Sequence, residues 1–207
     1  LAVWGVATLF VLFLVPLLRY ELYNRGQFAA ESVSLDPGFA TTAQTMEEPE
    51  GTATTAQLYF GSPYSTGLRP ETRILLLTDD TIENCKAAIK ALADGPRTAS
   101  VPVLARSARV RAIYLLNDGD LVVDLSRDVD VPGMQSASAE LLMARALTMT
   151  LAQPVLRAGS SPPVKRVQFL FEGAPTGSHF PEHIKLDFPI EPESTWIVPS
   201  GSRDGNV

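Results

Sequence analysis

The 207-residue sequence predicts a mixed α/β fold of the α+β kind, with two helices packed on a small mixed sheet. Short apolar runs of strand length alternate with two longer segments in which apolar residues recur every three or four positions. Turn residues such as Asp-Gly and Gly-Pro separate these segments. An uncharged stretch over residues 1–18 precedes them and predicts a membrane-spanning helix ahead of the folded domain.

Composition excludes several classes of partner. Hydrophobic residues make up 45% of the chain, which is enough for a core, and the net charge is −6. The 17 Lys and Arg form no basic stripe, so we expect no nucleic-acid partner. The single cysteine, Cys85, excludes an internal disulfide and a CxxC metal motif.

The N-terminal stretch has the length of a membrane span. Eighteen helical residues extend about 27 Å, close to the roughly 30 Å thickness of a bilayer core. Arg19 and Tyr20 follow where basic and aromatic anchors lie, so we expect residues 1–25 to form the span and its flank, with residues 1–18 in lipid. A cleaved signal peptide is the alternative, but its apolar region has about 7–15 residues. Since the sequence begins at Leu1, we also expect residues to precede it.

Residues 26–56 are predicted to be an extended acidic linker. From Gln27 to Ala56 there are five acidic residues and no Lys or Arg, without the period of a helix or a strand. Such a segment buries too little apolar surface to order itself, so we expect a partner protein to order it. Phe28, Leu35 and Phe39 are its predicted partner-binding residues.

A folded domain is expected over residues 57–190, followed by an extended tail over 191–207. Its first helix is predicted from Asp80, the acceptor of a capping box with Glu83, and is expected to end at Asp94 before Gly-Pro. Cys85 falls on the apolar face, which predicts a packed thiol. A second helix is predicted over residues 138–151. Strands are predicted at 58–60, 74–77 (a buried run), 110–116, 121–125, 167–171 and 184–188.

The aspartate-rich stretch Asn117–Asp130 raises the question of a calcium loop. An EF-hand loop starting at Asp118 would require an oxygen ligand at Val122 and a Glu at Val129, so the spacing fails. Asp118-Gly119 between two apolar runs instead predicts a β-hairpin with a type I′ turn. We expect Asp124 on the solvent face of the second strand, and no metal.

Five segments in this order resemble the GerMN domain of sporulation and spore-germination proteins, which also occurs in LpqB-type lipoproteins. The matching segments begin at Leu58, Leu92, Ser107, Ser138 and Val164, as LYF, LADGP, SARVRAIYLLNDGDLVVDLS, SAELLMARALTMTL and VKRVQFLFEG. The resemblance implies an extracytoplasmic, non-catalytic module that acts through protein–protein contacts. It therefore favours a periplasmic domain, against the cytoplasmic side that Arg19 and Arg25 indicate. Sporulation itself is a poor inference, because there is no lipobox cysteine and only one copy of the domain.

The sequence contains no catalytic constellation. No GxSxG, Walker A or dinucleotide motif occurs, so we expect no cofactor, no small-molecule substrate and no catalytic residue. His179 and His183 flank Pro181, which opposes the helix that an i, i+4 metal pair requires. We therefore expect solvated loop histidines. In the tail, Trp196 is a predicted partner-binding residue.

These observations favour a single-pass, non-enzymatic accessory subunit that braces the subunits of an integral-membrane protein complex. A respiratory complex or a photosynthetic reaction centre with its antenna would suit such a subunit. An extracytoplasmic sensor or ligand-binding module is an alternative of a different class. A peptidoglycan-related envelope enzyme is a third, with only the two histidines in its favour.

Overall fold

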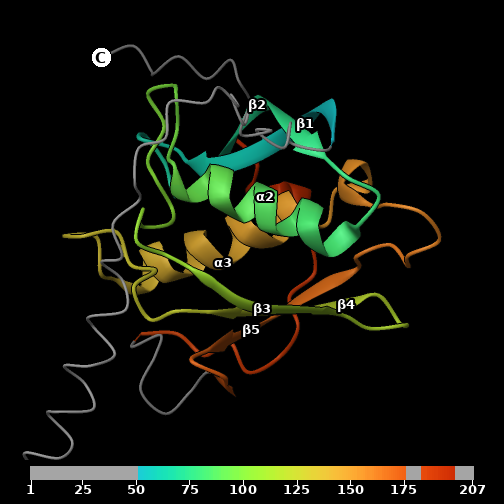
Figure 1. Cartoon of the computed structure of the whole chain (residues 1–207). Helices are drawn as coiled ribbons and strands as arrows, with labels where there is room; N and C mark the ends of the chain where they lie inside the picture. The colour runs from blue at the N-terminus through green and yellow to red at the C-terminus, as the bar shows by residue number, and fades with distance from the viewer. Residues whose placement is uncertain (1–50, 176–182, 199–207) are drawn as a thin grey trace, which may run out of the picture. The chain divides into compact units, whose positions relative to one another are not determined.

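The computed structural model describes residues 51–175 and 183–198 (Figure 1). Two longer helices and two sheets make up this part of the chain. The elements, in order, are β1 (Thr52–Gly61), β2 (Leu68–Leu77), α2 (Thr81–Ala93), β3 (Val110–Leu115), β4 (Asp120–Leu125), α3 (Ala137–Leu151), the 3-10 turn η1 (Pro154–Leu156), β5 (Arg166–Phe171), β6 (Ala174–Pro175) and the 3-10 turn η2 (Ser194–Trp196).

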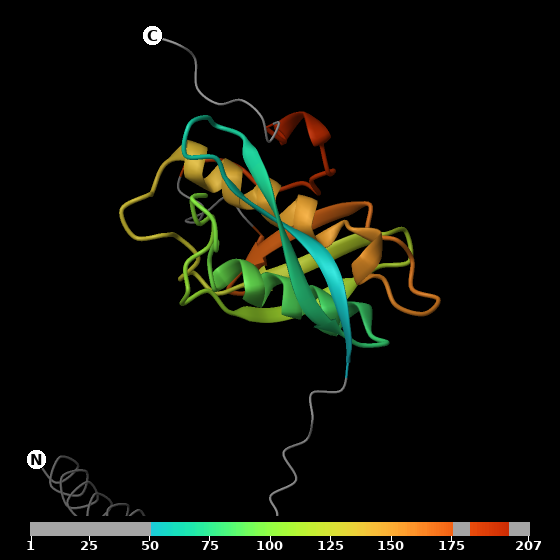
Figure 2. The same cartoon turned by 90° about the horizontal axis from the view of Figure 1, so that it is seen from above.

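The helices lie between two sheets in three layers, with β1 and β2 above α2 and α3, and β3, β4 and β5 below them (Figure 1). Seen from above, the β1–β2 hairpin crosses over both helices (Figure 2). We call β1–β2 the hairpin sheet and β3–β4–β5–β6 the four-stranded sheet. The α+β class is confirmed, but the prediction of one small sheet is incomplete because two sheets enclose the helices.

The helices are buried on both sides, which explains the second sheet. Buried residues of α3 include the neighbouring pairs Met143–Ala144 and Ala146–Leu147, which cannot all face one side of a helix. A helix that is apolar on most of its circumference requires cover on both sides. In α2, Asp80 caps the first turn by accepting hydrogen bonds from the backbone N–H groups of Ile82 and Glu83, as the sequence predicts.

The hairpin sheet is longer than the sequence indicates. β1 begins at Thr52, inside the segment predicted as linker, and pairs with β2 along its whole length, from Thr52 opposite Leu77 to Gly61 opposite Leu68. In β2 the prediction of a buried 74–77 run is wrong. Only Leu75 and Leu77 point inward, whereas Ile74 is 73% exposed.

The four-stranded sheet combines antiparallel and parallel pairs. β3 pairs with β4 antiparallel through the predicted hairpin, β4 pairs with β5 parallel, and β6 adds two residues antiparallel to β5. The connection between β4 and β5 includes α3, as a parallel pair requires. The residues of this sheet that point toward the helices are apolar and buried: Ile113, Leu121, Val123, Leu125, Val167, Phe169 and Phe171.

The type I′ turn predicted between β3 and β4 is not formed there, and a turn of that type occurs between β5 and β6. At the β3–β4 turn only Gly119 has a positive φ (96°), and its N–H donates to the carbonyl of Leu116. A type I′ turn requires two such residues, so the prediction of that type is wrong, and the geometry fits a type I turn followed by a glycine bulge. The type I′ pattern occurs instead at the β5–β6 turn, where Glu172 (φ 54°) and Gly173 (φ 77°) join paired residues Phe171 and Ala174.

The last described segment packs against the domain. The strand predicted at 184–188 is not formed; Leu186 is buried while Phe188 is 63% exposed, and Ile190 makes an isolated bridge to Val167. Farther on, Val198 donates its backbone N–H to the carbonyl of Leu68. Residues 191–198 therefore belong to the packed domain rather than to a separate tail.

The predicted membrane span and most of the linker, with Phe28, Leu35 and Phe39, lie outside the described residues. Within residues 51–175 and 183–198, every helix is too short or too polar to cross a bilayer.

Candidate interaction surface

The aspartates of the β3–β4 hairpin are held by residues of the domain itself. Asp118 accepts a hydrogen bond from the backbone N–H of Asp120 at 3.2 Å. Asp120 in turn forms a two-point ion pair with Arg166, at 2.6 and 2.8 Å. The hydrogen bond and the charge of Asp120 raise the pKa of Arg166. These carboxylates therefore fix the turn to β5.

The sequence predicts that Asp124 is exposed to solvent, and this prediction is wrong. Asp124 is buried, accepts from Arg111 Nε at 3.2 Å and accepts from the backbone N–H of Gly173 at 2.9 Å. Arg111 also pairs with Glu172. The carboxylate is buried because it links β3, β4 and the β5–β6 turn, which no local pattern shows.

A second buried carboxylate holds the loop after α2. Glu71 points inward from β2, pairs with Arg73 and accepts hydrogen bonds from the backbone N–H of Arg97 at 3.0 Å and from Thr98. Arg73 donates to the carbonyl of Gly95 at 2.9 Å. Although burial by itself raises the pKa of Glu71, these hydrogen bonds outweigh it, and the pKa lies below its usual value.

His183 is not the freely solvated loop residue that the sequence predicts. Its Nδ1 lies 2.8 Å from Oε1 of Glu140, which is 3% exposed, and the backbone N–H groups of His183 and Ile184 both donate to the same carboxylate. The pair thus ties the C-terminal segment to the first turn of α3. His179 lies outside the described residues.

None of these groups forms a reaction centre. Cys85 is fully buried, and burial, followed by the nearby charge of Asp80, raises its pKa to about 12, so the thiolate is absent at neutral pH. Among residues 51–175 and 183–198, no three His, Cys, Asp or Glu side chains are placed to bind a metal ion together.

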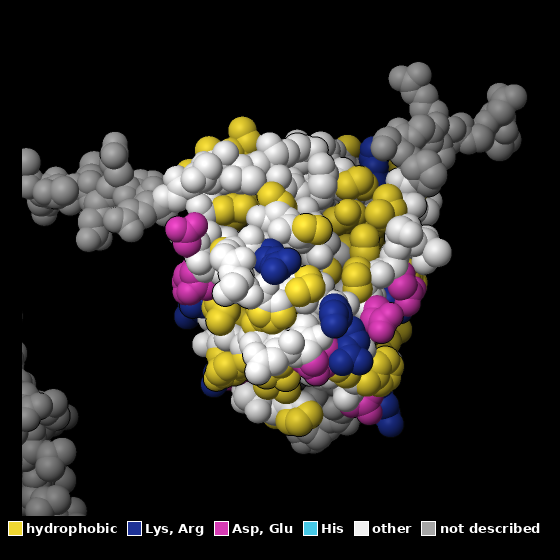
Figure 3. Space-filling view, turned by 90° about the vertical axis from the view of Figure 1, so that its right-hand side faces the viewer, with side chains coloured by type: hydrophobic (Ala, Val, Ile, Leu, Met, Phe, Trp, Pro, Cys, Tyr) yellow, Lys and Arg dark blue, Asp and Glu magenta, His cyan; other side chains and the backbone are white. Residues whose placement is uncertain are grey.

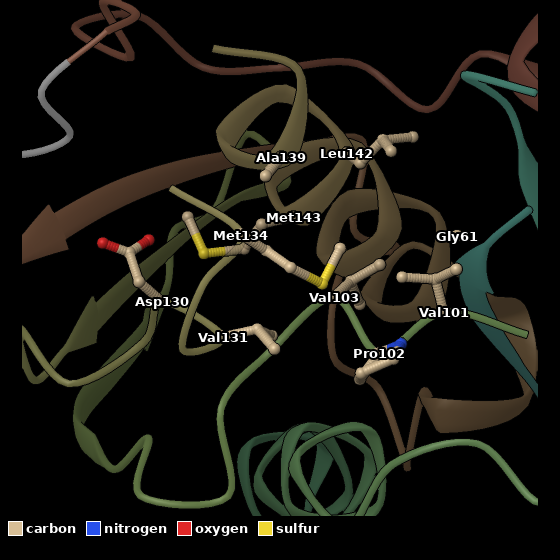
Figure 4. Close-up of a pocket in the computed structure, with 10 residues that line it drawn as sticks. All are labelled: Gly61, Val101, Pro102, Val103, Asp130, Val131, Met134, Ala139, Leu142 and Met143. Atoms are coloured by element: carbon tan, nitrogen blue, oxygen red, sulfur yellow. The ribbon is translucent and has the colours of Figure 1, made fainter. Parts of the chain in front are cut away.

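One pocket in the described part of the domain is too small for a metabolite. It lies between the Val101–Val103 segment, the loop at Asp130–Met134 and the start of α3, and has a cavity volume of about 20 Å³. In Figure 4 the side chains of Met134 and Met143 extend between loop and helix, and the carboxylate of Asp130 points away from them. Since ligand sites measure about 300–1,000 Å³, this space holds a water at most.

A larger hollow lies at the C-terminal end of α2. Its volume is about 490 Å³, within the range of ligand sites. Three prolines, together with Leu104 and Val131, form much of its wall, and Arg106 and Asp94 supply charges of opposite sign.

The outer side of the hairpin sheet is the candidate interaction surface. Eight side chains alternate outward on the two strands: Ala53, Thr55, Gln57 and Tyr59 on β1, and Pro70, Thr72, Ile74 and Leu76 on β2. None carries a charge at pH 7, since burial raises the pKa of Tyr59 above its usual value of 10.0. Ile74 is 73% and Leu76 47% exposed. We call these eight residues the neutral face.

Charged side chains are more frequent below the hairpin sheet than on it. In Figure 3 hydrophobic and uncharged side chains cover most of the upper part, where the hairpin sheet lies, and most charged side chains lie lower. An exposed, charge-free sheet face with two large aliphatic side chains is typical of a protein contact surface.

The two edges of the hairpin sheet differ. On β1, the backbone N–H groups of Gln57 and Tyr59 donate to Gln153 and Thr150, so side chains of α3 and the loop after it close this edge. On β2, Ile197 forms a parallel bridge with Leu68, and the backbone N–H of Val198 donates to the Leu68 carbonyl. Within the described part of the chain, the outward backbone groups from Thr72 to Leu76 have no hydrogen-bond partner. We call this stretch the free edge.

Of the predicted partner-binding residues, only Trp196 is described. Its ring packs on the guanidinium of Arg145, 5.3 Å from the ring centre, and its Nε1 donates to Glu193. Trp196 is therefore partly occupied within the domain, and its partner role stays a prediction. Sequence reasoning missed the neutral face, although the alternation Pro70, Thr72, Ile74, Leu76 could have indicated one uncharged side of a strand.

A protein-family model matches residues 57–177, more than half of the chain; it is named Germane and described as sporulation and spore germination. The match confirms the resemblance drawn from the sequence and covers β1 through β6 apart from the first residues of β1. No curated protein matches the chain.

Several solved structures are similar at low identity. A candidate lipoprotein from Clostridium perfringens is 18% identical with a TM-score of 0.44, covering 67% of this chain and 87% of that one. The tandem GerMN domains of the sporulation protein GerM from Bacillus subtilis are 17% identical with a TM-score of 0.48, covering 67% of this chain and 46% of that one. The first of those domains alone is 16% identical with a TM-score of 0.47, covering 69% of this chain and 98% of that one.

Proposed function

This chain belongs to the Germane family of sporulation and spore germination domains, and from that premise we propose that it is a non-catalytic, membrane-anchored accessory subunit. It binds other subunits of a membrane protein complex and braces them from the extracytoplasmic side. Residues 1–18, an uncharged run of membrane-spanning length, anchor it. The domain acts by contact rather than by chemistry.

The neutral face is the single observation that supports this function best. A sheet face that is uncharged and carries two exposed aliphatic side chains at one end gains free energy when another protein removes it from water. The buried carboxylates are consistent with the same function, because Glu71, Asp120, Asp124 and Glu140 all hold parts of the domain together.

Co-purification from native membranes in mild detergent tests the proposal. A variant with Ala53→Lys and Thr55→Lys places two charges on the neutral face and leaves β2 unchanged. We expect it to fold but to lose its partner subunits by at least about tenfold, since an unpaired buried charge opposes association. The matched control, Tyr114→Lys with Phe188→Lys, charges two exposed aromatics elsewhere and should retain the partners. Equal retention in both variants would refute the proposal.

The hollow at the end of α2 favours one second candidate, a module that binds a small ligand. In that case Arg106→Ala, which removes the cation of the hollow, would abolish a ligand-induced rise in the melting temperature of the purified chain. The neutral-face variant would leave that rise unchanged. Small-molecule screening by thermal shift therefore separates the two functions.

A further inference from the structure

The hollow at the C-terminal end of α2 is lined by one cation, Arg106, whose side chain has no partner within residues 51–175 and 183–198. We propose that this hollow binds an anionic amphiphile, a molecule with an apolar body and a single carboxylate or phosphate, and that Arg106 holds the anionic group. The inference rests on the second candidate function, because it names the class of ligand for the same hollow. It does not depend on the neutral face.

The walls of the hollow are fixed by contacts within the domain. In the first loop, after α2, the carbonyl of Gly95 accepts a hydrogen bond from Arg73 at 2.9 Å. In the second loop, the backbone N–H of Ala105 donates to the carbonyl of Val129 at 2.8 Å, which connects this loop to the one that contributes Val131. The hollow therefore has its shape before a ligand arrives, and binding does not have to order its walls.

Most of the wall is apolar. Pro96, Pro102 and Pro132 line the hollow together with Leu104 and Val131. The prolines have no backbone N–H, so these positions offer no hydrogen-bond donor. A sugar or another molecule with many polar groups would lose its hydrogen bonds to water against such a wall. An apolar body of a ligand gains free energy there, and the volume of about 490 Å³ accommodates one.

The charge that remains available in the hollow is positive. Asp94, the acidic residue of the lining, pairs with Lys90, whose Nζ lies 3.4 Å from Oδ2. The end of α2 is capped as well, because the backbone N–H groups of Asp94 and Gly95 donate to the carbonyls of Lys90 and Leu92. Arg106 is exposed and makes no such contact within the described part of the chain. The complementary ligand is therefore an anion.

The chemistry of arginine selects the kind of anion. A guanidinium donates two parallel hydrogen bonds to a carboxylate or a phosphate, which a neutral hydroxyl cannot accept in the same way. Because Arg106 is exposed to water, we expect a modest gain, of at least about threefold in the dissociation constant. The apolar wall supplies the rest of the affinity.

Titration of the full chain in mild detergent with short alkanoates tests the inference. The NMR resonances of Arg106 Nε–H and of the backbone amides of residues 93–107 report both the site and the dissociation constant. From butanoate to octanoate, the dissociation constant should fall about two- to fourfold with each added CH₂, since each CH₂ leaves water. Octanol, which has the same chain length and no charge, should bind at least about threefold more weakly than octanoate.

Substitutions separate the charge from the wall. Arg106→Ala should abolish the difference between octanoate and octanol but keep the dependence on chain length, and Arg106→Lys should restore part of the difference. The matched control is Arg97→Ala, which removes an exposed arginine that does not line the hollow and should change neither property. Micelles take up the probes equally for every variant, so differences between variants report the protein.

Octyl phosphate distinguishes two sources of such a ligand. Tighter binding of octyl phosphate than of octanoate would assign the hollow to the phosphate of a lipid. Tighter binding of octanoate would assign it to a free carboxylate. Both results keep the anionic amphiphile.

The inference and the proposed function can fail separately. In the co-purification experiment Arg106→Ala should retain the partner subunits, and the neutral-face variant should bind octanoate as the wild type does. Equal binding of octanoate and octanol to the wild type would overturn the inference. The absence of saturable shifts with every probe up to about 10 mM would overturn it as well.

Discussion

The two sheets lie on opposite sides of the same two helices, yet within residues 51–175 and 183–198 the C-terminal segment covers the outer side of only one of them. The C-terminal segment passes over the four-stranded sheet, where the carbonyl of Leu186 accepts from the outward side chain of Gln168 at 3.1 Å. Ile190 extends the same sheet by pairing with Val167. Of the described C-terminal segment, Ile197 and Val198 contact the hairpin sheet, at one end of β2.

The two sheets therefore differ in how far contacts within the domain cover them. The four-stranded sheet is stabilised within the domain, by the C-terminal segment and by ion pairs between its strands and turns. The hairpin sheet is firmly held on its inner side through Glu71 and Arg73 but leaves its outer side and one edge available. The domain therefore combines a self-contained half with a half whose outer side is exposed.

The largest effect is expected at the β3–β4 turn of the four-stranded sheet. Gly119→Val should destabilise the domain by about 4 kcal/mol or prevent folding, because a β-branched residue is strained at positive φ. A Cβ there would also lie 2.6 Å from the carbonyl oxygen of Pro163. Urea unfolding measures the loss. The control Gly133→Ala has a similar φ of 79° but open space, and should cost only about 1 kcal/mol.

The inner side of the hairpin sheet is tested by Glu71→Gln. We expect a loss of about 3 kcal/mol at pH 7, since Arg73 stays buried without its partner. The pKa of Glu71 is lowered on folding, so its contribution is full above its ordinary value of 4.5 and is lost as the pH falls through the folded value. The difference between wild type and variant should thus shrink below about pH 4.5. A difference that is constant from pH 7 to pH 3 would contradict this role.

Matched truncations compare the covered and the bare sides directly. Leu186→Ala removes a 3% exposed side chain with which the C-terminal segment packs into the core, and should cost about 2 kcal/mol. Leu76→Ala on the neutral face, 47% exposed, should cost less than about 0.5 kcal/mol. Chemical denaturation of both variants measures the difference. Equal losses would mean that the hairpin sheet is covered within the chain.

The smallest effect is expected in the helical layer. Because burial raises the pKa of Cys85 to about 12, the native thiol should not react with a thiol reagent at pH 8. Labelling should appear only in denaturant and follow the unfolding curve. Rapid labelling of the native chain would show that α2 opens locally.

Local patterns were sufficient to predict the helices and one hairpin. The apolar spacing of α2, its cap at Asp80 and its end at Asp94 are all local features, and the structure has them as expected. The β3–β4 hairpin was likewise visible in two apolar runs and an Asp-Gly turn. Its turn type was not, since that depends on the conformation of a single residue beside Gly119.

What the sequence did not show depends on distant partners. Glu71 and Arg73 are charged, so the sequence places them on the solvent side of β2. They point inward instead, where they bind Thr98 and the backbone after α2. Ile74, next to Arg73 in sequence, therefore points outward. Asp124 is buried because Gly173, 49 residues later, donates to it. The candidate surface was missed for the same reason, because the side of β2 that faces outward is decided by these contacts rather than by hydrophobicity.

The position of the covering segment at the end of the described chain has a consequence for biosynthesis. β4 cannot form its parallel pair until β5, about forty residues later, has been synthesised. Both Leu186 and Val198 emerge after the strands β1 to β6 have left the ribosome. A chain exported from its N-terminus therefore presents an incomplete four-stranded sheet until residue 190 has been translocated. Ribosome stalling before residue 183 should yield a nascent domain that is sensitive to proteases, and stalling well beyond residue 198 a resistant one.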